Sequence, residues 1–311
     1  GTILEDSGLI LGFIKSIRIR TRIFLAAAPA FLGMLIMPGG ALLSAPVIGK
    51  AGNHVENSTY TAVNVWFRHV LVIIYPLGAI LPTTKMANLS LYHELKYLVP
   101  AVIILLLLGY LFLLRRVPAT DIIDGRWNIK KIVPPLAIVL SAPVIHIILM
   151  SFFPAMLSEA ALLAAVGVSI VLGLVLGKIT LPSLPAMIVR SRPWKFFLLI
   201  LGMFVYQNVF KASNASEAIA TIIFSETFLI VGVSSFLGFV TGRTQVPVAI
   251  LLPIYHAKFS PQISPEIFAV LYTSTYIYLY GLYHLTGTPL CLCVTGILQN
   301  GHERFFQTTS P

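Results

Sequence analysis

Charged side chains enclosed by apolar sequence are the first candidates for chemistry in this chain. Glu5 and Asp6 are adjacent in such a stretch, and neighbouring carboxylates repel each other unless one is protonated or a cation compensates them. They are candidates for proton coupling or for a cation site, unless solvent reaches both. Arg243 lies in a short polar break between apolar runs, where a cation by default marks a function. It would pair with an anionic ligand, with a carboxylate such as Glu226 or Glu5, or with water at a shallower depth.

Hydroxyl and amide side chains collect where Gly or Pro interrupts apolar sequence. Their oxygens could coordinate Na+ beside unwound backbone carbonyls, and the free N–H groups of a new helix start could hold an anion. Ser and Thr also hydrogen-bond routinely between membrane helices, so the groups carry more weight than single positions. The candidate substrate-binding or ion-binding residues are Pro38, Gly39, Gly40, Ser44, Thr83, Thr84, Gly242, Arg243, Thr244, Gln245, Thr286 and Thr288.

Patterns for other chemistries are incomplete in this sequence. His93 and Glu94 begin a zinc-protease motif, but Tyr97 stands where the second His belongs. The sequence has neither a Gly-x-Ser-x-Gly elbow nor a Walker loop, so ATP-driven pumping by this chain finds no support. Cys291 and Cys293 are two residues apart, so on a helix they point away from each other. We therefore expect them to be small packing residues and not a disulfide or a metal-binding pair. We expect no cofactor and no metal, with Na+ as a candidate coupling ion.

The composition identifies lipid as the solvent of the elements that carry these residues. Of 311 residues, 57% are hydrophobic and 10% are charged, and the mean hydropathy is +0.91. A membrane-spanning helix needs about 20 mostly apolar residues, and residues 97–114, 132–153 and 160–176 approach or meet that length. We predict an all-α integral membrane protein. Because Gly1 rather than Met opens an apolar stretch, we expect a truncated N-terminus.

Basic residues indicate which loops face the cytoplasm. The formal net charge of +10 is explained by the excess of Lys and Arg in cytoplasmic loops, so nucleic acid is not expected as a partner. The basic segments are residues 15–22, 115–131 and 178–195. If these segments are cytoplasmic, residues 58–81 cross the membrane to an extracytoplasmic loop at 82–93. Arg68 and His69 lie near the middle of that span, where we expect Arg68 to neutralise a carboxylate from a neighbouring helix.

Residues 23–48 form an apolar segment that begins and ends on the cytoplasmic side under the same rule. The segment is about as long as one span, so it cannot cross once. Met37-Pro38-Gly39-Gly40 interrupts it, and Pro and Gly both disfavour helix continuation. We predict a re-entrant helical hairpin with its tip at mid-membrane, where irregular backbone must be buried in protein or line a watery cavity.

A second segment repeats this pattern in the opposite orientation. Phe31-Leu32-Gly33-Met34 of the first hairpin has a partner in Phe236-Leu237-Gly238-Phe239. A break containing Thr and Pro follows each segment downstream, at 81–84 and at 286–289. Residues 194–210 lead out of the cytoplasm, so the second hairpin, 222–255, begins and ends outside. We predict inverted repeats over residues 1–114 and 132–311, joined by a cytoplasmic linker at 115–131. The alternative is two unrelated proline-kinked helices.

Residues 1–9, Gly-Thr-Ile-Leu-Glu-Asp-Ser-Gly-Leu, and residues 37–46, Met-Pro-Gly-Gly-Ala-Leu-Leu-Ser-Ala-Pro, carry a family resemblance. They resemble the domain-of-unknown-function 401 family, which is grouped with the ion transporter superfamily of citrate, dicarboxylate, gluconate and arsenite carriers. The resemblance covers nearly the whole chain. It implies a multi-pass protein of the prokaryotic cytoplasmic (inner) membrane, in which each repeat adds a hairpin and a discontinuous helix to a coupled anion site. It also implies a homodimer through a scaffold formed by residues 97–176 together with the missing N-terminal part.

The hairpin tips depart from the dicarboxylate carriers of that superfamily. The tips have Pro-Gly-Gly and Gly-Arg-Thr in place of a Ser-Asn-Thr signature, which puts a carboxylate substrate in doubt. We expect a secondary active transporter, not an enzyme, which moves a small anionic solute with Na+ or H+ by alternating access around a midplane site. The alternative is an intramembrane protease or lipid-modifying enzyme that uses Glu5, Asp6 and His69. A channel would lack two gates of opposite orientation.

Overall fold

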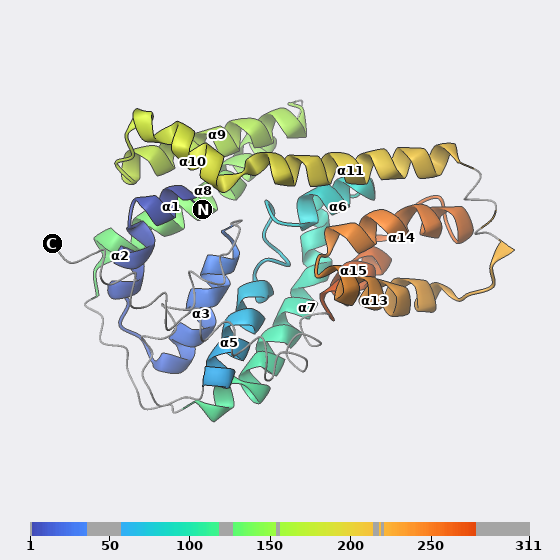
Figure 1. Cartoon of the computed structure of the whole chain (residues 1–311), viewed down its shortest axis with the longest axis horizontal. Coiled ribbons are helices and arrows are strands. Elements are labelled where there is room, and N and C mark those ends of the chain that lie inside the picture. The colour runs from blue at the N-terminus through green and yellow to red at the C-terminus, as the bar shows by residue number, and fades with distance from the viewer. Residues whose placement is uncertain are drawn as a thin grey trace.

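The computed structural model describes residues 2–35, 57–117, 127–153, 156–213, 218 and 221–277, and its regular elements are helices (Figure 1). This confirms the predicted all-α class. In chain order the elements are α1 (Thr2–Asp6), α2 (Leu9–Lys15), α3 (Thr21–Gly33), α5 (Asn57–Val70), α6 (Ile80–Met86), α7 (Leu91–Phe112), η1 (Leu114–Arg116), α8 (Ile129–Phe152), α9 (Ser158–Leu176), η2 (Leu181–Ser183), α10 (Leu184–Ser191), α11 (Pro193–Ala212), η3 (Phe228–Val233), α13 (Ser234–Thr241), α14 (Gln245–Lys258), α15 (Pro265–Ser274) and η4 (Thr275–Ile277).

Four helices of the described chain are long and apolar enough to cross a membrane. They are α7 with its continuation to Arg116, α8, α9 and α11. Their outward faces carry large apolar side chains that are exposed in the described structure, such as Leu107 at 56% and Leu163 at 75% exposure. A soluble protein rarely leaves surfaces of this kind in water. The chain is therefore a membrane protein, and helices lie at the predicted spans 97–114, 132–153, 160–176 and 194–210.

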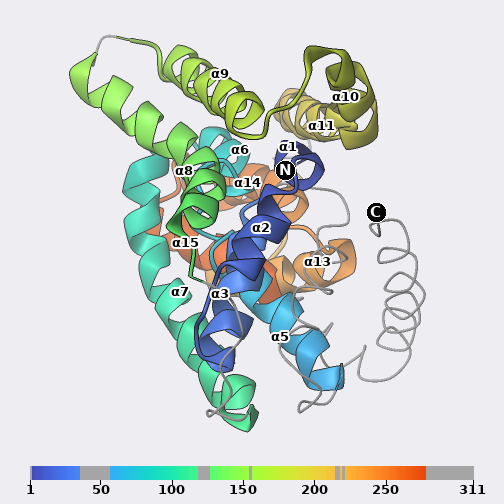
Figure 2. The same ribbon diagram turned by 90° about the vertical axis from the view of Figure 1, so that its left-hand side faces the viewer.

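Helices α8 and α9 form an antiparallel pair. The hydroxyl of Ser169 on α9 donates to the carbonyl of Ile138 on α8 (2.8 Å). At the other end of the pair, His146 Nε2 contacts the carbonyl of Ser158 (3.2 Å), and its Nδ1 contacts the hydroxyl of Tyr92 on α7 (2.6 Å). Helices α9, α10 and α11 lie along one side of the molecule in both views (Figures 1 and 2). The pair thus links this outer layer to α7.

The most deeply buried side chains come from helices of both predicted repeats. Phe24 of α3, Phe67 of α5, Leu98 of α7, Leu252 of α14 and Tyr272 of α15 are all at most 1% exposed. They belong to one continuous cluster of buried side chains. The core therefore lies where α3, α5 and α7 of the first half meet α14 and α15 of the second.

Two of the basic segments that the charge pattern places in the cytoplasm are in contact. Arg22 Nε donates to the carbonyl of Val117 (2.7 Å), and the amide of Asn128 donates to the carbonyl of Ser16 (3.4 Å). Segments 15–22 and 115–131 therefore share one side of the molecule, as the charge rule requires.

The span predicted at 58–81 is broken earlier than the sequence indicated. Helix α5 ends at Val70, and residues 71–79 form turns in which, for example, the Gly78 amide donates to the carbonyl of Tyr75 (2.8 Å). Pro76 cannot donate to a helix, which accounts for a break here. The break predicted at 81–84 and the loop predicted at 82–93 are wrong in part, because residues 82–86 belong to α6 and 91–93 to α7. Pro82 is the third residue of α6, where an N–H would have no intrahelical partner.

The second predicted hairpin is a pair of short helices joined by a tight turn. Phe228 to Thr241 forms one arm and α14 forms the other, and α13 packs against α14. Fourteen residues in α14 rise about 21 Å at 1.5 Å per residue, which is less than the roughly 30 Å of a bilayer core. The thirteen residues of α3 are similarly short. The tip predicted at 37–40 lies outside the described residues.

Candidate functional site

The tip of the second hairpin is a turn fixed by Gly242. Its φ of 60° and ψ of 24° are in the left-handed region, which Gly adopts without the steric cost of a Cβ. Its amide donates to the carbonyl of Gly238 (2.9 Å), which closes the last turn of α13. The hydroxyl of Thr241 lies within hydrogen-bonding distance of the carbonyls of Leu237 (2.7 Å) and Arg243 (3.1 Å). Two sequence-predicted residues, Gly242 and Arg243, therefore form this tip.

Helix α14 starts at the tip with its N-terminus uncapped by a side chain. Thr244 is the N-cap residue, but its side chain makes no capping bond; it is 3% exposed and hydrogen-bonded to Tyr276 of η4. The first N–H groups of α14 therefore need other partners, and they carry the positive end of the helix dipole. Arg243 precedes them and is exposed. This combination suits a small anion.

Neither carboxylate suggested by the sequence neutralises Arg243. Glu226 accepts a hydrogen bond from the hydroxyl of Tyr255 on α14 (2.9 Å). The ion pairs among the described residues are Lys85 with Glu159 and Arg190 with Asp6. Arg243 thus presents a positive charge that no described carboxylate pairs.

The arm α13 contacts the backbone of η4 through a glycine. A Cβ on Gly238 would lie 2.2 Å from the carbonyl oxygen of Thr275, a distance that real Cβ atoms do not reach. The hydroxyl of Thr275 donates to the carbonyl of Tyr272 (2.6 Å), and the hydroxyls of Tyr272 and Tyr276 are 3.2 Å apart. Tyr276 also bonds Thr244, so the end of α15 is connected to the hairpin tip.

Helix α3, the first arm of the first predicted hairpin, makes the same kind of contact with α5. A Cβ on Gly33 would lie 1.8 Å from the carbonyl oxygen of Arg68. Gly33 and Gly238 are the third residues of the two matched Phe-Leu-Gly segments. We call these two close approaches the paired glycine contacts.

Thr83 and Thr84 are completely buried on α6. Each hydroxyl donates to carbonyls of the preceding turn, including that of Ile80 at 3.0 Å for Thr83 and 2.8 Å for Thr84. Their donors are therefore used inside the helix, while the oxygens keep acceptor capacity. Helix α6 packs against α14, so this element of the first half touches the second hairpin. The remaining predicted site residues, Pro38, Gly39, Gly40, Ser44, Thr286 and Thr288, lie outside the described residues.

The residues of the enzyme alternative are not gathered around one point. Glu5 and Asp6 are exposed on α1, where Asp6 pairs with Arg190 of α10. The hydrogen bond that Arg190 donates to the carboxylate of Asp6 raises the pKa of Arg190 above its ordinary value. His69 Nδ1 contacts the carbonyl of Val65 in its own helix (2.7 Å). Helices α1 and α5 lie in different parts of the molecule in both views (Figures 1 and 2).

Within the part of the chain that the structure describes, Arg68 does not form the ion pair with a carboxylate that the sequence led us to expect. Its Nη1 atom is buried and has no hydrogen-bond partner within the described chain. The backbone of Arg68 is in close contact with α3, because its carbonyl oxygen lies against Gly33.

Comparison with known proteins places the chain in a family. The model of the family described as "Protein of unknown function (DUF401)" matches residues 16–308. The chain belongs to the DUF401 family. Neither the curated proteins nor the solved structures include a match. The resemblance noted in the sequence is confirmed at the level of this family.

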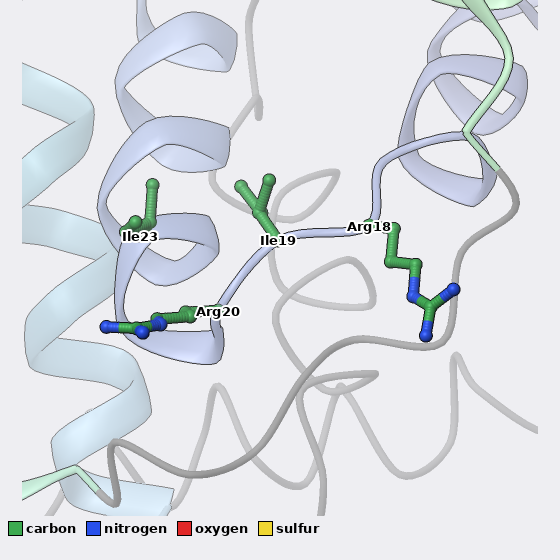
Figure 3. Close-up of a pocket in the computed structure, with 4 residues that line it drawn as sticks. All are labelled: Arg18, Ile19, Arg20 and Ile23. Atoms are coloured by element: carbon green, nitrogen blue, oxygen red, sulfur yellow. The ribbon is translucent and has the colours of Figure 1, made fainter.

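A surface hollow of the DUF401 chain is lined by Arg18, Ile19, Arg20 and Ile23, between α2 and α3 (Figure 3). Both arginines are exposed, and their guanidinium groups point away from each other. They do not converge on a single anion. The hollow fits a solvated basic loop rather than a binding site.

Sequence reasoning missed the burial of Glu94, a carboxylate that stands out among those the structure describes. It lies in the first turn of α7 with 0% exposure, and both of its oxygens are buried without a hydrogen-bond partner in the described structure. Leaving a buried acceptor unpaired costs roughly 1–3 kcal/mol, and more if it is charged. The incomplete zinc-protease motif involves only the chain neighbours of Glu94, whereas its burial depends on α15, which packs against α7. The signal available was an acidic residue in the first turn of a strongly apolar helix.

Proposed function

We propose that this DUF401 protein is a secondary active transporter of a small anionic solute, driven by Na+ or H+. The solute site would lie near the hairpin tips and open alternately to either side of the cytoplasmic membrane of a prokaryote. The observation that carries the proposal is the pair of glycine contacts, because it extends the inverted repeat from sequence to packing.

The paired glycine contacts support equivalent roles for the two hairpins. In each, the Phe-Leu-Gly segment lies in the last turns of a short apolar arm, and the glycine contacts the backbone of the segment that follows the hairpin. That backbone belongs to Arg68 in the first half and Thr275 in the second, at nearly the same distance along the chain from its glycine. Unrelated proline-kinked helices would give no reason for this correspondence.

Arm length and broken helices agree with a carrier of this type. Arms too short to span a bilayer suit hairpins that enter and leave on one side. The turns at 71–79, between α5 and α6, supply an unwound segment of the kind that carriers use at a midplane site. The charge rule orients the two hairpins oppositely. These are the parts that alternating access requires.

The second tip favours an anion as the solute. Arg243 and the uncapped start of α14 place a full and a partial positive charge side by side. Because no described carboxylate neutralises Arg243, a ligand with negative charge would complete the site. The left-handed backbone of Gly242 sets the turn that places Arg243 directly before the first residues of α14.

A stability measurement tests the proposal. The detergent-purified protein is heated with a panel of carboxylates, oxyanions and neutral solutes, in Na+ or K+ and at two pH values. A ligand at a hundredfold excess over its Kd stabilises by about 2.7 kcal/mol. We expect an anion to do so and to lose its effect in Arg243→Gln.

Arg18→Gln is the matched control for Arg243→Gln. It removes another exposed guanidinium, from the loop between α2 and α3, and should leave the stabilisation unchanged. The proposal fails if no solute stabilises a well-folded sample, or if Arg243→Gln keeps the full effect.

A further inference from the structure

Glu94 is a carboxyl group enclosed at the contact between α7 and α15. Its side chain has 0% exposure, and neither oxygen has a hydrogen-bond partner among the described residues. Buried polar atoms in folded proteins are nearly always paired, so an exception of two atoms on one group requires an explanation.

The charged surroundings of Glu94 do not favour its ionised form. Glu266, in the first turn of α15, is the neighbour whose charge acts on Glu94, and it has the same sign. The hydroxyl of Tyr97, one turn along α7, is hydrogen-bonded to Glu266. On α6, Lys85 is paired with Glu159. The other titratable or charged groups on α7 and on the elements packed against it are Tyr92, His93, Lys96 and Tyr110 of α7, Tyr60, Arg68 and His69 of α5, Tyr272 of α15, and Arg115 and Arg116 of η1.

A bound proton explains this environment better than an ionised carboxylate does. Ionised Glu94 would be a buried charge with no partner, beside a second negative charge. The N-terminal dipole of α7 favours a negative charge, but neither Glu94 oxygen accepts a bond from a helix amide. That interaction is also weaker than the cost of burying an unpaired charge. Protonation removes the charge and needs no further group.

A metal ion is a poorer occupant of the same place. Hard cations take about six oxygen ligands, and no group of three His, Cys, Asp or Glu in the described residues could hold one. The carboxyl groups of Glu94 and Glu266 and the hydroxyl of Tyr97 are the nearby oxygen groups with an established interaction. The occupant that fits is a proton.

We propose that Glu94 is a proton-binding site that holds its proton while α7 and α15 are closed and exchanges it when their contact opens. The step is the binding of one proton to one carboxylate oxygen, with no other reactant. By the charge rule, the segments before α7 and α15 both face outside, so the exchange is with the extracytoplasmic side. A role of Glu94 in coupling proton movement to transport rests on the proposed function. Proton binding by Glu94 does not depend on that function.

Infrared spectroscopy of the full chain in detergent tests the proton site directly. At neutral pH, we expect the carbonyl stretch of a protonated carboxylic acid, and we expect it to disappear at alkaline pH. Glu94→Gln, which resembles the neutral acid in shape, should lack the band and still fold. Glu159→Gln changes an exposed glutamate, side chain 68% exposed, and should keep the band. Glu266→Gln removes the neighbouring charge and should lower the pH at which the band disappears.

The outcomes separate the proton site from the carrier. A band that remains in Glu94→Gln, or a wild-type spectrum without the band at neutral pH, overturns the proton site. Loss of the band in Glu94→Gln alone supports it, whether or not any solute stabilises the protein. If the band behaves as expected but no solute binds, the proposed function fails while the proton site stands. If a solute binds with equal pH dependence in wild type and Glu94→Gln, the coupling role of Glu94 is wrong.

Discussion

Single residues decide how closely the backbones of this protein approach. At Gly33 and Gly238 the neighbouring carbonyl oxygen occupies the space that any Cβ would need. The atom in the way is backbone, which cannot rotate aside as a flexible side chain can. These two positions therefore accept glycine alone, whereas Gly202 on α11 has nothing within 4 Å of an added Cβ.

We expect Gly33→Ala and Gly238→Ala each to destabilise the protein by about 1–3 kcal/mol, because overpacking forces the helices apart. Gly202→Ala should instead be neutral or stabilising by up to about 1 kcal/mol, since Ala favours a helix over Gly. Thermal unfolding in detergent measures all three. Equal Tm values for Gly33→Ala and Gly202→Ala would contradict the close contact with Arg68.

The sequence identified some site residues and could not identify others, for a reason visible at Arg243 and Glu94. Arg243 stands out because local signals, a glycine and two apolar flanks, define the tip. The burial of Glu94 depends on α15, which is far away in the chain, and no local pattern reports that contact. Thr83 and Thr84 were selected as part of a break, but the structure places both inside α6.

Among the elements, the break between α5 and α6 shows how a long span is divided. Pro76 lacks the N–H that a continuous helix would use, so turns replace the helix over residues 71–79. The break is anchored by the buried hydroxyl of Tyr75, which donates to the carbonyl of Val139 on α8 (3.0 Å). Sequence predicted one break in this span. Pro76 and Pro82 both lack an N–H, so the sequence alone does not distinguish the proline that breaks the helix from the one in the first turn of α6.

Tyr75→Phe should lower the free energy of unfolding by about 0.5–1.5 kcal/mol, the usual net value of one hydrogen bond. Because the substitution also leaves the buried carbonyl of Val139 without this donor, we expect the loss of unfolding free energy to lie toward the upper end of that range. Tyr110→Phe on α7 is the matched control, because that side chain is 47% exposed and should make little difference. Chemical denaturation of both variants compares them. If Tyr75→Phe is as stable as Tyr110→Phe, the hydroxyl does not anchor the break.

The whole molecule combines an outer layer of long apolar helices with a core made by both halves. Helices α9 and α11 expose their apolar sides, while α6 of the first half packs against α14 of the second. The class and the long spans follow from composition and run length, which need no long-range information. The packing of α6 on α14 and of α7 on α15 joins distant parts of the chain, and hydrophobic patterns alone do not specify it.

The orientation of the hairpins is the property of the whole molecule on which a carrier depends. If the charge rule holds, the loop after α9 faces the cytoplasm and the loop between α14 and α15 faces outside. In a background with Cys291→Ser and Cys293→Ser, single cysteines at the exposed Thr180 and Gln262 can be labelled with a membrane-impermeant maleimide on intact cells.

We expect Gln262→Cys to react from outside and Thr180→Cys to react only after permeabilisation. The background variant should not react, because it has no thiol. Labelling of both cysteines from the same side would mean that α11 and the second hairpin do not separate the two loops. The two hairpins would then not be oppositely oriented, and an inverted repeat, with alternating access between two equivalent tips, would be excluded.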